Sequence, residues 1–311
     1  MSKPVPVFQM THWSSYSRAL KRRGSLMVWF DREMAWFAAS SGKAGHPEIF
    51  SAAAIQFCLS VKVLFGLPLR QATGFVESLL ALSGLDWPVP DCTTLCRRQK
   101  NLKVQIPYRA ASGPLHLLVD SAGIKFSGEG EWHVRKHGAC RRRQWRKIHI
   151  GIDAETLEMR AVETTSNRIG DAPVLPDLLT QIPLEEQIGS VTADGIYDTK
   201  TCHAAIAARG ADAIIPPQRN ARAWKGHDPG LQARNEALRA CKRFGRANWK
   251  KWSGYHRRSR VEAKMRCLKL LGERIMARDF DRQDAEVQIR IALRNRFTSL
   301  GTPETVRMRS R

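Results

Sequence analysis

The stretch GPLHLLVD, residues 113–120, is where the chain changes from helical patterns to strand-like patterns. Gly113 and Pro114 interrupt the preceding segment, and His116–Val119 is a short apolar run that ends at Asp120. Short apolar runs bounded by turn-forming residues are typical of buried strands. We therefore expect a strand here with a carboxylate at its end.

The segments that follow this strand predict an α/β domain. Ile148, Ile150 and Ile152 alternate with polar or small residues, which is typical of a strand. The expected order is three strands, a helix, a strand, a helix, a strand, and then a helix that begins near Tyr255. The remaining elements are expected at Lys147–Ile152, Met159–Thr165, Ala172–Gln181, Ser190–Ala193, Thr199–Arg209 and Ala213–Pro216. This order fits an RNase H-like, or retroviral-integrase-like, sheet in which the first and fourth strands are adjacent.

Three carboxylates from distant segments would meet in such a sheet. Asp120 ends the first strand, Asp194 ends the fourth, and Glu262 lies on the helix after the fifth. Hard divalent cations prefer oxygen ligands, and two-metal phosphoryl transfer uses carboxylates to hold two ions about 4 Å apart. We therefore predict that these three residues are both metal ligands and catalytic residues. Taken singly, each could instead be a strand-end cap or an exposed helix acid.

Three further acids lie near the ends of predicted strands or helices, namely Asp153, Asp171 and Asp198. Aspartate at such positions commonly accepts hydrogen bonds from nearby backbone groups. Turn or capping roles are therefore favoured for all three, and direct contact with a metal is the alternative.

The segment GYHRRSRVEAKMRCLK, residues 254–269, carries four polar residues at spacings of three, four and seven: Tyr255, Arg258, Glu262 and Lys269. At about 100° per residue they fall within roughly a 60° sector of one helical face. A solvated helix face would explain this pattern. However, an acid beside a phenol, a guanidinium and an ammonium is also what a metal-bound, phosphate-facing helix would present.

Residues 1–112 read as helical. Apolar residues recur at helical spacing over Ser51–Phe65 and Pro68–Leu82, and Asp91 can cap a short third helix. Two helices, a tight turn and a basic third helix suggest a helix-turn-helix DNA reader, and an ordinary helical bundle with a basic rim is an equal alternative. The candidate DNA contacts on the third helix are Arg97, Arg98 and Lys100.

The charge of the chain indicates a polyanionic partner. Its 311 residues include 51 Lys and Arg against 29 Asp and Glu, for a net charge of +22 and a pI near 10.3. Residues 217–260 hold thirteen Lys and Arg against two acids, and residues 127–150 hold seven against two. Such an excess is typical of a surface that binds nucleic acid or, less often, anionic lipid, and it argues against acidic proteins and small neutral substrates as main partners.

The basic insertion expected at residues 217–254 also carries tryptophans. Bases stack on aromatic side chains whatever the base sequence, and each stack is worth about 1–3 kcal/mol. Trp249 and Trp252 are therefore candidates to stack on a displaced DNA base. The favoured alternative is that the tryptophans anchor the insertion to the core.

Membrane insertion, secretion and a disulfide framework are not supported. The most apolar stretch, Phe50–Leu69, is interrupted by polar residues, Gly and Pro, and the N-terminus lacks an apolar signal region. The seven cysteines are scattered and odd in number. We expect a protein of the bacterial cytoplasm, associated with the nucleoid.

The sequence resembles the bacterial insertion-sequence DDE transposases of the insertion-sequence-five type. The resemblance rests on LLVDSAGIK at 117–125, SVTADGIYDT at 190–199, and the signature Tyr-x2-Arg-x3-Glu-x6-Lys at Tyr255, Arg258, Glu262 and Lys269. It implies an end-binding domain at residues 1–112, an RNase H-like catalytic domain at 113–300 and a basic tail at 301–311.

The same resemblance implies a mechanism. Asp120, Asp194 and Glu262 would hold two Mg²⁺ ions, with Mn²⁺ as a substitute, for strand cleavage and transfer into target DNA. Arg258 and Lys269 would contact phosphates near the scissile bond, and Tyr255 would position the terminal nucleotides. The partners would be terminal inverted repeats, target DNA and a second copy of the chain in a dimeric synaptic complex. A nuclease without strand joining and a non-catalytic helix-turn-helix regulator are the alternatives.

Overall fold

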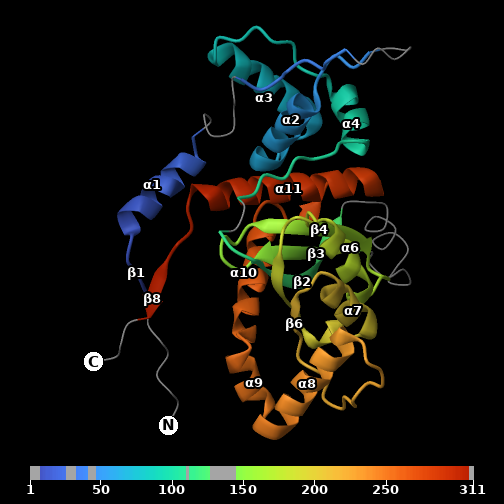
Figure 1. Cartoon of the computed structure of the whole chain (residues 1–311). Coiled ribbons are helices and arrows are strands. Elements are labelled where there is room, and N and C mark those ends of the chain that lie inside the picture. The colour runs from blue at the N-terminus through green and yellow to red at the C-terminus, as the bar shows by residue number, and fades with distance from the viewer. Residues whose placement is uncertain (1–7, 26–32, 41–46, 110–111, 127–144, 308–311) are drawn as a thin grey trace, which may run out of the picture.

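A computed structural model of the chain describes residues 8–25, 33–40, 47–109, 112–126 and 145–307 (Figure 1). Most of the basic stretch expected at 127–150 therefore lies outside the described residues. The strands are β1 (Phe8–Met10), β2 (Leu115–Phe126), β3 (Trp145–Asp153), β4 (Met159–Ser166), β5 (Ile188–Thr192), β6 (Asp212–Ile214), β7 (Arg274–Ile275) and β8 (Thr305–Arg307).

The helices are α1 (Trp13–Arg23), α2 (Ala52–Phe65), α3 (Leu69–Leu82), α4 (Cys92–Lys100), α6 (Leu175–Thr180), α7 (Lys200–Ala208), α8 (Pro229–Phe244), α9 (Arg246–Trp252), α10 (Ser259–Lys269) and α11 (Phe280–Leu300). Short 3-10 turns are η2 (Ala172–Val174), η3 (Gly195–Tyr197) and η4 (Tyr255–Arg258).

The central sheet is mixed and has six strands, in the order β4-β3-β2-β5-β6, with β7 pairing with β2. Strands β2, β3 and β4 form an antiparallel meander, whereas β5 and β6 run parallel to β2 and to each other. The first and fourth strands predicted from the sequence are β2 and β5, and they are neighbours as expected. This mixed α/β arrangement fits an RNase H-like domain.

Strand β2 is longer than the sequence pattern indicated. Its antiparallel pairing with β3 continues to Lys125, opposite Trp145, whereas its parallel pairing with β5 stops at Leu118, opposite Thr192. Asp120 therefore lies within the strand, and the prediction that it ends the strand was wrong. It does lie just beyond the part of β2 that β5 covers, which leaves room beside it for groups from other elements.

Helices cover both faces of the sheet. The odd-numbered residues Leu117 and Val119 of β2 pack in a buried cluster with α6 and α7. The even-numbered Leu118 and Ile124 pack in a second cluster with Val261 of α10 and with α11. Because side chains alternate along a strand, Asp120 lies on the α10 side of the sheet.

Helix α11 is shared between the sheet and the N-terminal helices, and Figure 1 shows it running between them. Val287 and Ile291 pack toward the sheet, whereas Ile289 and Leu293 belong to the buried cluster of α2, α3 and α4. A helix that is apolar on two sides is expected to be buried between two layers. The division of the chain at residue 112 stays a prediction, and the two parts share this helix.

Helices α2, α3 and α4 form as the sequence indicated. The Ser51 side chain accepts from the Ala54 N–H at the start of α2, and Asp91 accepts from the Thr94 N–H at the start of α4. Within the described part of the chain, no single helix is long and apolar enough to cross a bilayer. Helices α2 and α3 meet that test only as a pair bent by 109°.

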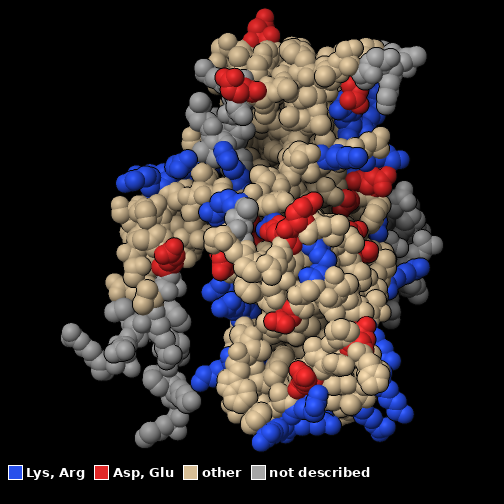
Figure 2. Space-filling view, in the orientation of Figure 1, with Lys and Arg blue, Asp and Glu red and all other residues tan. Residues whose placement is uncertain are grey.

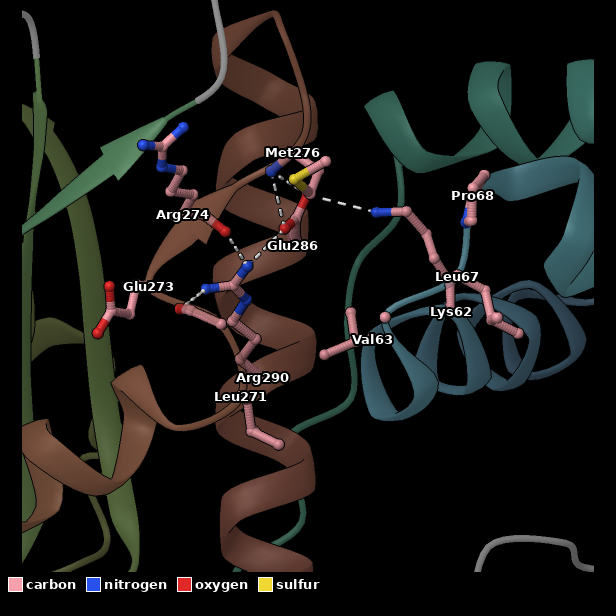
Figure 3. Close-up of a pocket in the computed structure, with 12 residues that line it drawn as sticks. Lys62, Val63, Leu67, Pro68, Leu271, Glu273, Arg274, Met276, Glu286 and Arg290 are labelled. Carbon is pink, nitrogen blue, oxygen red and sulfur yellow. Dashed lines mark hydrogen bonds and ion pairs between the residues drawn. The ribbon is translucent and has the colours of Figure 1, made fainter.

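A cavity of about 490 Å³ lies where the turn after α2 faces α11 and β7 (Figure 3). Buried Glu286 accepts from the Met276 N–H at 3.0 Å and from Arg290 Nη2 at 2.7 Å, and it pairs with Lys62 Nζ at 3.5 Å. Arg290 also donates to the Gly272 carbonyl. These contacts tie α2 to the segment after β7 through the Glu286 side chain of α11.

Candidate active site

The three predicted carboxylates come from three different elements. Asp120 is on β2, Asp194 follows β5, and Glu262 lies in the first turn of α10. Asp194 Oδ1 also accepts from the Ile196 N–H at 2.9 Å, which fixes the carboxylate at the start of η3. Asp120 accepts from the Ser121 N–H at 2.9 Å.

The Arg258 side chain joins these carboxylates. Its Nη2 lies 2.9 Å from Asp120 Oδ1 and 3.7 Å from Asp194 Oδ2, and its Nη1 lies 2.6 Å from Glu262 Oε1. The side chains of Asp120 and Arg258 are 15% and 16% exposed, whereas Glu262 is 59% exposed. The cluster therefore has a shielded inner side at β2 and an open side at α10.

Burial and charge act against each other in this cluster. Burial raises the pKa of Asp120 above its ordinary value, and the charge of Arg258 opposes that shift. Burial lowers the pKa of Arg258, but the surrounding acidic groups outweigh it, so this pKa stays above its ordinary value. The guanidinium therefore remains a fixed positive charge among the carboxylates.

Tyr255 and Arg258 do not lie on the helix of Glu262. They form the 3-10 turn η4, and α10 begins at Ser259, so the prediction that one helix carries all four residues was wrong. Arg258 and Glu262 nevertheless face each other, since Arg258 Nη1 lies 2.6 Å from Glu262 Oε1 at a spacing of four residues. Tyr255 is half-buried beside Trp249, with Lys250 Nζ 4.8 Å from its ring centre. Burial raises the pKa of Tyr255, which keeps the phenol protonated.

Lys269 is an exposed residue at the end of α10. It follows Glu262 by seven residues, which places it roughly 10 Å farther along the helix axis. It is therefore on the same helix as Glu262 but stands apart from the carboxylate cluster.

The predicted contacts on α4 lie away from this cluster. Arg98 donates to the Phe50 carbonyl at 3.0 Å and pairs with Glu48, and Lys100 pairs with Asp281 of α11 at 3.8 Å. Arg97 is exposed. Two of the three predicted DNA contacts on α4, Arg98 and Lys100, thus pair with acidic side chains of the same chain.

The two tryptophans of the insertion differ in exposure. Trp249 is only 8% exposed, which favours the alternative that it anchors the insertion to the core. Trp252 is 63% exposed, with the edge of its ring against Phe244. Figure 2 shows Lys and Arg side chains gathered around α8 and α9, at the lower end of the molecule.

Sequence reasoning missed a buried network that begins four residues after Asp194. Arg234 of α8 donates to both oxygens of Asp198 at 3.0 Å, and His203 lies 3.2 Å from the same carboxylate. The Arg234 guanidinium also stacks 4.1 Å from the Trp224 ring centre. The only sequence signal was the Asp198 carboxylate itself, because its partner lies 36 residues away.

The other two acids have local roles. Asp153 accepts from the Glu155 N–H and the Thr156 hydroxyl, which confirms its predicted role in a turn. Asp171 pairs with Lys147 at 2.9 Å. Neither therefore has a carboxylate free of protein partners.

The donor set of the cluster suits a hard divalent cation, since it consists of three carboxylates. Over the described ranges, no three His, Cys, Asp or Glu side chains are close enough to share one ion as they stand. Arg258 lies between the three carboxylates. The chemistry of the residues therefore fits a metal centre, and the guanidinium contacts carboxylate oxygens that a metal ion would use.

Comparison with known families agrees with this geometry. A family model described as "Transposase DDE domain" matches residues 111–296, which contain all three carboxylates, and a second model with the same description matches residues 21–129. No solved structure matches the chain. Since the first match covers more than half of the sequence, the chain belongs to the DDE transposase family.

Proposed function

We propose that the chain is a DNA transposase that binds the terminal inverted repeats of an insertion sequence and carries out metal-dependent strand cleavage and strand transfer. The observation that supports this most directly is the convergence of Asp120, Asp194 and Glu262 on Arg258 from three separate elements. A regulator without catalytic activity has no need of such a cluster.

Asp120, Asp194 and Glu262 would hold two Mg²⁺ ions, or Mn²⁺ in their place. When bound, these ions supply Lewis-acid chemistry that activates the attacking oxygen and stabilises the leaving oxygen. The shielded position of Asp120 limits access of water to the inner side of the site, whereas the exposed Glu262 admits substrate from the α10 side.

The remaining signature residues would position DNA. Arg258 can bind a phosphate with two parallel hydrogen bonds, and Lys269 can bind the backbone farther along α10. Tyr255 is protonated and partly open, so it can contact the terminal nucleotides. The exposed Trp252 and the basic side chains of α8 and α9 would hold the strand that leaves the site.

End recognition is proposed for the N-terminal helices. Helix α4 is short, basic and partly exposed, as a recognition helix needs to be. Arg97, Arg98 and Lys100 would lie along the DNA, and Arg98 and Lys100 would exchange an acidic partner for phosphate. Two copies of the chain would pair two ends in a synaptic complex.

The test is to incubate the purified protein with Mg²⁺, labelled element ends and a supercoiled target. Joined products support transposition, nicks alone indicate a nuclease, and shifted bands without cleavage indicate a regulator. Asp120→Asn, Asp194→Asn and Glu262→Gln should each abolish cleavage and joining while end binding is retained. Loss of end binding in parallel with activity, in folded protein, contradicts the assignment.

Asp212→Asn is the matched control for charge removal. Asp212 is an exposed residue at the start of β6, where it pairs with Ser190, and this is the end of the parallel strands opposite to Asp194. The variant should cleave and join at the wild-type rate.

A further inference from the structure

We propose that Arg258 acts as a latch: its side chain occupies the carboxylate cluster in the free protein and leaves it when DNA binds. Metal binding and DNA binding are therefore coupled. In this role Arg258 bridges Asp120, Asp194 and Glu262 in the free protein and moves to a DNA phosphate when an end is bound. The inference rests on the proposed function, because it takes the three carboxylates to be the metal ligands.

The Arg258 side chain contacts all three carboxylates at once. A guanidinium has five N–H donors in a fixed plane, and here Nη1 and Nη2 divide three carboxylates between them. Arg258 Nε is buried and has no hydrogen-bond partner among the described residues. The side chain is thus committed almost wholly to the cluster, through the two nitrogens at its tip.

Arg258 and a metal ion would compete for the same carboxylate oxygens. A Mg²⁺ ion needs carboxylate oxygens at about 2.0–2.1 Å in a nearly octahedral arrangement. Arg258 Nη1 and Nη2 already lie 2.6 and 2.9 Å from the Glu262 and Asp120 oxygens that such an ion would use. The guanidinium and the ions are both cationic, so they repel each other as well as compete. Metal ions therefore bind tightly only after Arg258 has turned away.

A DNA phosphate can take the place of the carboxylates as the partner of the Arg258 guanidinium. The planar guanidinium of arginine can donate two parallel hydrogen bonds to two oxygens of a phosphate as it does to a carboxylate, so a DNA phosphate near the site offers an equivalent partner. Arg258 belongs to the short turn η4 between α9 and α10, and Glu262, one turn along α10, is largely exposed. The open side of the cluster is thus the side from which a phosphate can reach Arg258.

The consequence is a reciprocal coupling. If DNA removes Arg258 from the carboxylates and thereby tightens metal binding, metal must tighten DNA binding by the same factor. Couplings of this kind commonly amount to about 5- to 150-fold. Without DNA, the cluster stays latched and binds metal weakly, which restrains cleavage at places where no end is bound.

The test measures binding of Mn²⁺ alone by electron paramagnetic resonance, without any activity assay. Arg258→Gln should bind Mn²⁺ about tenfold more tightly than the wild type in the absence of DNA. Arg258→Lys retains the charge but cannot bridge three carboxylates, so its affinity should lie between the two. Arg257→Gln is the matched control: it removes an exposed charge from the same turn and should leave the affinity unchanged.

A second measurement compares Mn²⁺ binding by the wild type with and without DNA. Adding a short duplex cut from the inverted repeat that flanks the coding region should tighten Mn²⁺ binding by a similar factor. In Arg258→Gln the same duplex should have no effect on Mn²⁺ affinity.

The outcomes separate the two proposals. If Asp120→Asn and Asp194→Asn weaken Mn²⁺ binding but Arg258→Gln and added DNA leave it unchanged, the latch is overturned and the proposed function stands. If the two carboxylate variants bind Mn²⁺ as tightly as the wild type, the carboxylates are not the metal site, and both proposals fail.

Discussion

Arg234 of α8 donates from Nε and Nη2 to the two carboxylate oxygens of Asp198, and both side chains are almost fully buried. Asp198 follows η3, which begins directly after Asp194. The pair therefore connects the basic insertion to the segment that carries one of the three candidate metal ligands. Trp224 and His203 enclose the pair, so water has little access to it.

Replacing Arg234 by Met should destabilise the fold. The variant leaves the Asp198 carboxylate buried with one charged partner fewer, and breaking a buried ion pair in this way costs about 3–5 kcal/mol. The free energy of unfolding, measured in urea by circular dichroism, checks this. Arg239→Met is the control, because Arg239 is an exposed residue of the same helix, and its change should stay within about 0.5 kcal/mol. An equal loss of unfolding free energy in both variants would mean that the buried ion pair contributes no more to stability than an exposed arginine does.

The same pair should make stability depend on pH under acidic conditions. Burial raises the pKa of Asp198, but hydrogen bonds from His203, Arg234 and the Gln218 N–H outweigh it and hold the pKa at about 2, below the ordinary value of 3.8. A carboxyl with a lowered pKa stabilises the fold above its unfolded pKa, and this stabilisation is lost as the pH falls through the folded value. The wild type should therefore lose about 2 kcal/mol between pH 5 and pH 2 that Asp198→Asn does not lose. Parallel stability curves for the two proteins over this range would refute the assignment.

The sequence predicted the elements that have a clear period and missed those that depend on distant partners. Strand β3 has alternating isoleucines, and helices α2 and α3 have apolar residues at helical spacing, so each was predicted within a few residues. Strand β7 has two residues and forms only because β2 is available to pair with it. Helices α8 and α9 were not predicted, because their many Lys and Arg residues were interpreted only as a basic insertion.

The sequence also predicted only part of the candidate site. The positions of Asp120, Asp194 and Glu262 follow from the order of elements, because adjacent β2 and β5 bring two of them together and α10 brings the third. The contacts of Arg258 could not be predicted from spacing. Its distance from Asp120 is 138 residues in the chain but 2.9 Å between the side chains.

Trp252 and Trp249 should behave in opposite ways when each is replaced by Ala. Trp252 is exposed, so Trp252→Ala should weaken binding of a single-stranded oligonucleotide by about 1–3 kcal/mol and change stability little. Trp249 is buried, so Trp249→Ala should cost about 3–5 kcal/mol of folding free energy. Fluorescence anisotropy and urea unfolding give the two quantities. A Trp252→Ala protein with full affinity and full strand-transfer rate removes the stacking proposal.

Binding to DNA should weaken steeply with salt, because the net charge of +22 is concentrated in defined regions of the chain. A protein that makes six to ten phosphate contacts loses about 10³- to 10⁵-fold in affinity between 50 and 200 mM salt.

Lys250 and Lys251 of α9 are basic residues of the insertion, and the side chain of Lys251 is exposed. If both contact phosphates, Lys250→Gln with Lys251→Gln should reduce the slope of log affinity against log salt by about 2, since each contact contributes about 0.9. Anisotropy titrations at several salt concentrations measure this slope. Because counterion release depends on the number of phosphates neutralised and not on the base sequence, the reduction should be the same for an inverted repeat and for unrelated DNA of equal length. A wild-type affinity that does not change with salt would mean that the basic insertion does not bind the DNA backbone.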